Sequence, residues 1–316
     1  MSPITSIALA LGVLSHIFYF RSGEHQFLVT FYLRLVLITP LALAMSLSYL
    51  LQQRFLGQLR LVVIAELQYI IGVYLTMVFY RVSPLHRLSV YPGPLAYRVS
   101  KLAHAYQNRN FKNYQNLYST HQTYGDYVRT GPSELSIIDL DAIEPILASS
   151  SHCKRAAWYA MAHPLKAIFH TTDRGEHEKR RRVWSDGFST NNLKAYETRI
   201  ETHISRLMRK IDRVAADGQP LNVSLWLNYF SFDVMGEVGF GRAFGMLETG
   251  EKLAVLKILE GGQKGLGVFG VVPWLFMLLT KLPWISAEHN VFVKWCETQI
   301  LDRKKVSMFL NAQNES

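Results

Sequence analysis

The densest charged segment of the sequence runs from His177 to Arg182 and reads His-Glu-Lys-Arg-Arg-Arg. On a helix, His177 and Arg181 would stand four residues apart and share one face. A guanidinium fork offers paired N–H donors and an imidazole adds a third, so the pair could hold a carboxylate or a phosphate group. The alternative is a solvated basic helix face, which most charge runs form, and the spacing alone favours that alternative.

Other patterns associated with catalysis or metal binding are missing from the sequence. It contains no Gly-x-Ser-x-Gly, no phosphate-binding glycine-rich Lys-Ser/Thr loop and no His-Glu-x-x-His. Cys153 and Cys296 are the only cysteines, which excludes a disulfide-stapled scaffold and a cysteine-rich zinc protein. The net charge of +10 suits a nucleic acid, a membrane surface or an anionic partner. Without a helix-turn-helix or zinc signature, we exclude nucleic acid.

The basic segment needs a helix to position it. Asp173 is the predicted first residue of that helix, with Glu176 as a reciprocal cap. The preceding stretch, residues 149–172, is predicted to be irregular. Further predicted elements are helices over residues 97–124, 140–148, 191–216, 222–240 and 291–305, a hairpin over 127–139, and a flexible loop at 261–267 within a glycine-rich stretch that runs to residue 270. The fold class is therefore mainly α with a small β-sheet.

Residues 1–80 differ from the rest of the chain. Uncharged or nearly uncharged apolar runs cover residues 4–20, 35–53 and 62–80, the last interrupted only by Glu66. Because a spanning helix needs about 20 mostly apolar residues, we predict a membrane anchor with two or three transmembrane helices. A cleaved signal peptide is the competing interpretation of residues 1–20, but no basic residue precedes Arg21 and no cleavage site follows the run.

Basic residues follow the anchor. Arg81, Arg87, Arg98 and Lys101 precede the next acidic residue, Asp126, so we expect the chain after residue 80 to face the cytosol. The sequon at Asn222 would then be unmodified. Residues 81–96 are rich in proline and are predicted to form a stiff connector between the anchor and the globular part.

Several segments in this order resemble the N-terminal portion of a fungal-type, membrane-bound cytochrome P450. The proline-rich entry at 81–94, the hairpin segment 124–137, the basic segment 177–189 and the segment 229–241 each match a part of that fold. The resemblance covers roughly residues 80–310. It implies a partial cytochrome P450 domain over residues 97–316, preceded by the transmembrane helices.

The resemblance also implies a function and a set of site residues. The family carries a Trp-x-x-x-Arg pattern whose side chains hold a haem propionate, and the matching positions are His177 and Arg181, with histidine in place of tryptophan. Trp158 and Phe169 are candidates to line the substrate pocket, although core packing explains them equally well. The implied activity is a monooxygenase reaction on a lipophilic small molecule in fungal secondary metabolism. Such enzymes take electrons from an NADPH-dependent reductase and lie in the membrane of the endoplasmic reticulum.

One family feature has no counterpart in the sequence. The chemistry depends on an axial cysteine thiolate, and neither Cys153 nor Cys296 lies in the family's glycine-rich setting. The central oxygen-activating helix and the Glu-x-x-Arg helix are also missing. We therefore expect a C-terminally truncated chain without a stable thiolate-ligated haem. The alternative function is a catalytically inactive, truncated membrane protein.

Overall fold

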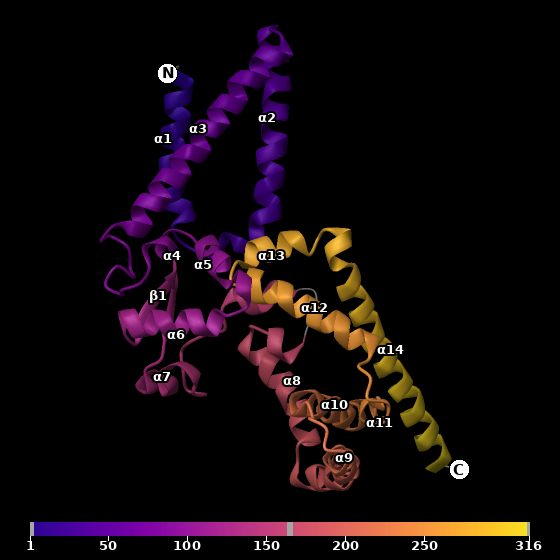
Figure 1. Ribbon diagram of the computed structural model, residues 1–316. Coiled ribbons are helices and arrows are strands. Elements are labelled where there is room, and N and C mark those ends of the chain that lie inside the picture. The colour runs from indigo at the N-terminus through magenta and orange to yellow at the C-terminus, as the bar shows by residue number, and fades with distance from the viewer. Residues whose placement is uncertain (1–2, 163–166, 315–316) are drawn as a thin grey trace. The chain divides into compact units, whose positions relative to one another are not determined.

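The computed structural model describes residues 3–162 and 167–314 (Figure 1). Residues 163–166, which belong to the stretch predicted to be irregular, lie outside the described residues. The chain divides into two compact units, which are described separately below. The first unit comprises the residues up to Met161 together with Gly265–Lys281, and the second comprises Ala162–Lys264 and the chain from Leu282 onward. The architecture is mainly helical with one two-stranded sheet, which confirms the predicted fold class.

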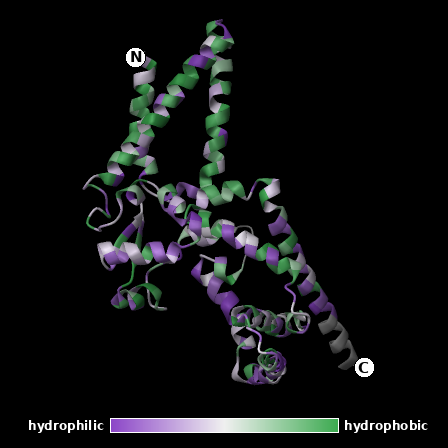
Figure 2. Ribbon diagram, in the orientation of Figure 1, coloured by the Kyte–Doolittle hydropathy of each residue, from purple (hydrophilic) through white to green (hydrophobic). Residues whose placement is uncertain are grey.

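Three long apolar helices open the first unit. Each is long and apolar enough to cross a membrane, so the structure favours three spans over two. Figure 2 shows that hydrophobic residues cover them around most of their circumference. The three helices are α1 (Pro3–Ser15), α2 (Val29–Leu51) and α3 (Phe55–Val82). The π-helical turn η1 (His16–Phe20) extends α1, and the 3₁₀ turn η2 (His25–Leu28) precedes α2.

The helices α1 and α3 cross at two glycines. A Cβ atom on Gly12 would lie 2.1 Å from the carbonyl oxygen of Tyr69, and a Cβ atom on Gly72 would lie 2.4 Å from that of Leu9. Only residues without a Cβ atom allow this approach, which is how small residues bring membrane helices together. The packing of α1 on α3 therefore depends on both glycines.

A hairpin subdomain follows the anchor. The strands β1 (Tyr127–Gly131) and β2 (Glu134–Ile137) pair antiparallel, with Tyr127 opposite Ile137, which confirms the predicted hairpin. Around it lie α4 (Leu95–Val99), α5 (Lys101–Gln107), the 3₁₀ turn η3 (Asn108–Asn110), α6 (Asn113–Tyr124), the 3₁₀ turn η4 (Leu140–Ala142), α7 (Ile143–Leu147) and the 3₁₀ turn η5 (Ala157–Ala162).

The single helix predicted for residues 97–124 is wrong. Ser100 has extended backbone, and its side chain accepts a hydrogen bond from the amide of Leu102, which starts α5. Phe111 has a φ of 57°, in the left-handed region that ends a helix. Polar caps and one left-handed residue thus divide the segment, although it contains neither proline nor glycine.

The second unit is a cluster of helices. It contains the 3₁₀ turn η6 (Ile168–His170), α8 (Arg174–Gly187), α9 (Thr190–Ala216), α10 (Val223–Met235), the π-helical turn η7 (Gly236–Phe240), α11 (Met246–Thr249), the first part of α12 (Ala254–Phe269) and α14 (Pro283–Asn314). The last part of α12 and the helix α13 (Pro273–Leu279) belong to the first unit. Buried residues of α9, α10, α11 and α12 form one apolar core: Leu207, Tyr229, Met246, Leu247, Val255 and Leu256.

The flexible loop predicted at residues 261–267 is also wrong, because α12 extends through Phe269. Glycine costs roughly 1 kcal/mol in a helix relative to alanine. The apolar face of α12 offsets that cost, since Val255 and Leu256 are buried in the core and Leu259 packs against it. Tertiary packing therefore overrides the local preference of the glycines for a loop.

Candidate functional site

The basic segment lies on α8, as predicted. The Asp173 carboxylate accepts a hydrogen bond of 2.8 Å from the amide of Glu176 and caps the helix at its N-terminus. The helix brings His177 and Arg181 to one face, one turn apart. His177 is half-buried and Arg181 is exposed. The local pattern of the sequence thus places both candidate residues together.

Acidic side chains of the same helix neutralise some of the neighbouring cations. Arg174 pairs with Glu178 at 3.2 Å, and Arg180 pairs with Glu176 at 2.9 Å, both across one helical turn. Glu176, predicted as a reciprocal cap, uses its carboxylate for this pair with Arg180. Within residues 3–162 and 167–314, the structure gives no carboxylate within ion-pair distance of Arg181. Arg181 is therefore available for an anion from outside the helix, with the His177 ring on the same face.

The two cysteines lie in different settings. Cys153 is exposed in the irregular stretch after α7, and Cys296 is half-buried on α14. Burial raises the pKa of the Cys296 thiol, which disfavours the thiolate form that a metal requires. In the part of the chain that the structure describes, no group of three or more His, Cys, Asp or Glu residues could hold a metal ion.

The candidate pocket residues Trp158 and Phe169 lie in different units of the chain. Trp158 lies in η5, where its indole N–H donates a hydrogen bond of 2.6 Å to the carbonyl oxygen of Gly270. Phe169 lies in η6 and its side chain is 54% exposed. Their assignment to a substrate pocket therefore stays a prediction.

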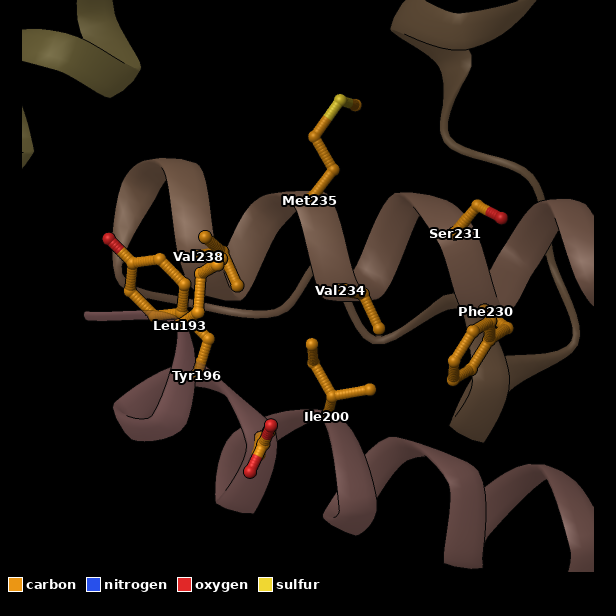
Figure 3. Close-up of a pocket in the computed structure, with 9 residues that line it drawn as sticks. Leu193, Tyr196, Ile200, Phe230, Ser231, Val234, Met235 and Val238 are labelled. Carbon is orange, nitrogen blue, oxygen red and sulfur yellow. The ribbon is translucent and has the colours of Figure 1, made fainter. Parts of the chain in front are cut away.

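Sequence reasoning missed a groove between α9 and α10. Its volume is about 610 Å³, and it is lined by Leu193, Tyr196, Glu197 and Ile200 of α9 and by Phe230, Ser231, Val234, Met235 and Val238 of α10 and η7. Figure 3 shows Val234 and Phe230 of α10 pointing toward α9, and Ile200 of α9 pointing toward α10. The signal was present in the sequence, because Leu193, Tyr196 and Ile200 recur at helical spacing.

Comparisons with a family model and with curated proteins agree on one family. The family model for cytochrome P450 matches residues 92–304. The chain is 34% identical to the cytochrome P450 monooxygenase FCK2 of Fusarium pseudograminearum over 306 residues, which cover 95% of this chain and 55% of that protein. It is 34% identical to the monooxygenase notG' of Aspergillus versicolor over 303 residues, with 96% and 55% covered. It is 32% identical to the tryprostatin B 6-hydroxylase of Neosartorya fischeri over 302 residues, with 93% and 54% covered.

The chain thus spans about half the length of the curated relatives it matches. No solved structure matches it.

Proposed function

Given that the chain belongs to the cytochrome P450 family, we propose that it supplies the membrane-anchored, haem-propionate-binding part of a monooxygenase that inserts oxygen into a lipophilic small molecule in fungal secondary metabolism. The single observation that carries this proposal is Arg181, which lies on α8 inside the matched region without a carboxylate partner among the described residues. Haem, the family's cofactor, supplies the iron at which dioxygen is activated.

The residues of α8 fit a haem propionate. Arg181 would donate two parallel N–H bonds to the carboxylate, and His177 would donate a third from its imidazole. Arg174 and Arg180 pair with Glu178 and Glu176, whereas among the described residues no carboxylate lies within ion-pair distance of Arg181. Because Arg181 is exposed, its guanidinium would lose less water on pairing with a propionate than a buried guanidinium would. The free-energy cost of forming the pair is therefore low.

The cysteines do not fit the axial position. Cys153 is exposed in an irregular stretch, and the raised pKa of the Cys296 thiol opposes a thiolate. We therefore assign no axial ligand to a residue of this chain and propose no step that depends on one. For the same reason we expect no thiolate-type Soret band in the reduced carbon monoxide spectrum of the purified chain.

The anchor and the charge distribution support a domain plan and a location. We propose that residues 1–80 form the anchor, 81–96 the connector and 97–316 a partial cytochrome P450 domain, with the residues after 80 in the cytosol at the endoplasmic reticulum. The last span ends at Val82, and the next helix begins at Leu95. The basic residues after the last span favour the cytosolic side. The net charge of +10 suits an acidic partner such as an NADPH-dependent reductase.

A haem titration of the full chain in detergent tests the cofactor assignment. We expect Arg181→Ala to weaken haem retention by about tenfold or more, because a bidentate ion pair is lost. The matched control is Arg182→Ala, which removes an adjacent exposed cation of the same helix. Equal haem retention by both variants would overturn the assignment of Arg181.

Gene disruption tests the activity. The disrupted strain is expected to lose a lipophilic metabolite and to accumulate a precursor that lacks one oxygen atom, as mass spectrometry of culture extracts would show. An unchanged metabolite profile under conditions in which the gene is expressed would contradict the monooxygenase proposal.

A further inference from the structure

We propose that the segment between the third span and α4 is a membrane-contacting surface, in which Leu85 and Val90 insert among the lipids and Arg87 pairs with anionic headgroups. The sequence predicted only a stiff connector here. The structure shows a series of turns and bends over residues 83–91 directly after α3, where the chain loops before it enters α4 (Figure 1).

The position of this segment follows from three aromatic or cationic side chains. The Tyr80 ring lies in the last turn of α3, and the guanidinium of Arg21, directly after the first span, lies 4.5 Å from its centroid. The His86 ring lies 4.8 Å from the same Tyr80 ring. Since two spans end at this level and Tyr and Arg side chains favour the membrane–water interface, His86 lies at headgroup depth.

Hydrogen bonds then fix the backbone around His86. The Ser89 amide donates to the His86 carbonyl at 2.9 Å, the Leu88 amide donates to His86 Nδ1 at 3.0 Å, and the Ser89 hydroxyl donates to the Pro84 carbonyl at 2.9 Å. Ser83 and His86 are buried, whereas Leu85 between them and Arg87 and Val90 after them are exposed. Leu85 is 73% exposed and Val90 is 83% exposed, and Arg87 is also exposed.

The chemistry of this surface fits a lipid bilayer. Two apolar side chains held outward at headgroup depth are stabilised when they leave water for the boundary of the lipid chains. No acidic residue occurs between Glu66 and Asp126, whereas Arg87 and other cations follow the span. Anionic headgroups attract such cations at the membrane surface. The surface is also continuous with the third span, so no second partner is needed to bring it to the membrane.

Depth-dependent fluorescence quenching tests the proposal on the full chain. In a background with Cys153→Ser and Cys296→Ser, an environment-sensitive fluorophore would be attached at Leu85→Cys or Val90→Cys. The matched control is Leu147→Cys in α7, a leucine that is 76% exposed and lies in the same unit, away from the spans (Figure 1). The labelled proteins would be reconstituted into vesicles of phosphatidylcholine with phosphatidylserine that carry a shallow spin-labelled lipid.

The expected result is strong quenching by the spin-labelled lipid at positions 85 and 90 and weak quenching at 147. Aqueous iodide should give the reverse order. Arg87→Ser should reduce the quenching at both positions at least twofold in vesicles with phosphatidylserine and leave it unchanged in pure phosphatidylcholine. The proposal is wrong if iodide quenches the fluorophore at position 85 or 90 as strongly as the fluorophore at position 147. It is also wrong if Arg87→Ser leaves the lipid quenching at positions 85 and 90 unchanged in vesicles with phosphatidylserine.

Discussion

The Arg129 guanidinium in β1 donates a hydrogen bond of 3.1 Å to the carbonyl oxygen of Arg81, in the last turn of α3. The Arg129 side chain is completely buried and donates also to the carbonyl oxygens of Gly131 and Pro132. Its backbone amide donates to the carbonyl oxygen of Pro92 at 2.7 Å. A buried cation is stabilised here by main-chain carbonyls, one of them at the negative end of a helix. The residue thus joins the hairpin, the connector and the third span.

Replacement of this residue should loosen the connector. Arg129→Met leaves buried carbonyl groups without donors and should lower the free energy of unfolding by on the order of 3 kcal/mol. Limited proteolysis with chymotrypsin should cut the variant faster between α3 and α4. The control is Arg109→Met, which removes an exposed guanidinium stacked 4.2 Å from the Tyr106 ring. Equal cleavage rates in both variants would contradict the role of Arg129.

Stability should decrease in mild acid because of His86. Burial, followed by the charges of Arg129 and Arg81, lowers the pKa of His86 from 6.5 to about 4. Between these two values the unfolded chain binds a proton that the folded chain does not, so the stabilisation present above pH 6.5 is lost as the pH falls toward 4. Thermal unfolding in detergent should show a steeper pH dependence for the native chain than for His86→Asn.

The lowered pKa of His104, which has burial as its main cause, acts in the same direction in both proteins. The difference between the native chain and His86→Asn therefore isolates His86. Identical pH dependences of the two proteins would show that the pKa of His86 is the same in the folded and the unfolded chain.

The crossing of α1 and α3 predicts sensitivity at Gly12 and Gly72. Leucine at either position would collide with the backbone of the facing helix and should destabilise the anchor by roughly 1–3 kcal/mol or more. The expected readout is an earlier loss of the monodisperse peak when detergent extracts are heated before size-exclusion chromatography. The control is Gly57→Leu in α3, where a Cβ atom would meet nothing within 4 Å. A matching loss in all three variants would indicate general sensitivity of the membrane helices.

The proposed orientation can be mapped by glycosylation. Three spans with the globular part in the cytosol place the turn at Gln52–Arg54 on the luminal side. A hydrophilic insert with an acceptor sequon in that turn should be modified in microsomes, and the same insert with glutamine for asparagine should not. Asn222, whose side chain caps α10 by accepting from the Leu225 amide at 3.1 Å, should stay unmodified. Glycosylation of Asn222 would place the chain after the third span on the luminal side and would contradict the proposed orientation.

Local patterns predicted part of the fold correctly. The apolar runs predicted the three long apolar helices, the turn residues predicted the hairpin, and Asp173 predicted the start of α8. Each of these signals involves residues close together in the chain. The placement of His177 and Arg181 on one face is another such local signal, because residues four apart share a face of any α-helix.

The sequence alone therefore determined the family resemblance, the anchor and the one-turn spacing of His177 and Arg181. Only the tertiary structure decided that α12 continues through a glycine-rich segment, because the core packs against its apolar face. The burial of Arg129 likewise depends on the Arg81 carbonyl, 48 residues away in the chain. Such positions are set by contacts between distant segments, and these contacts leave no periodic signal in the local sequence.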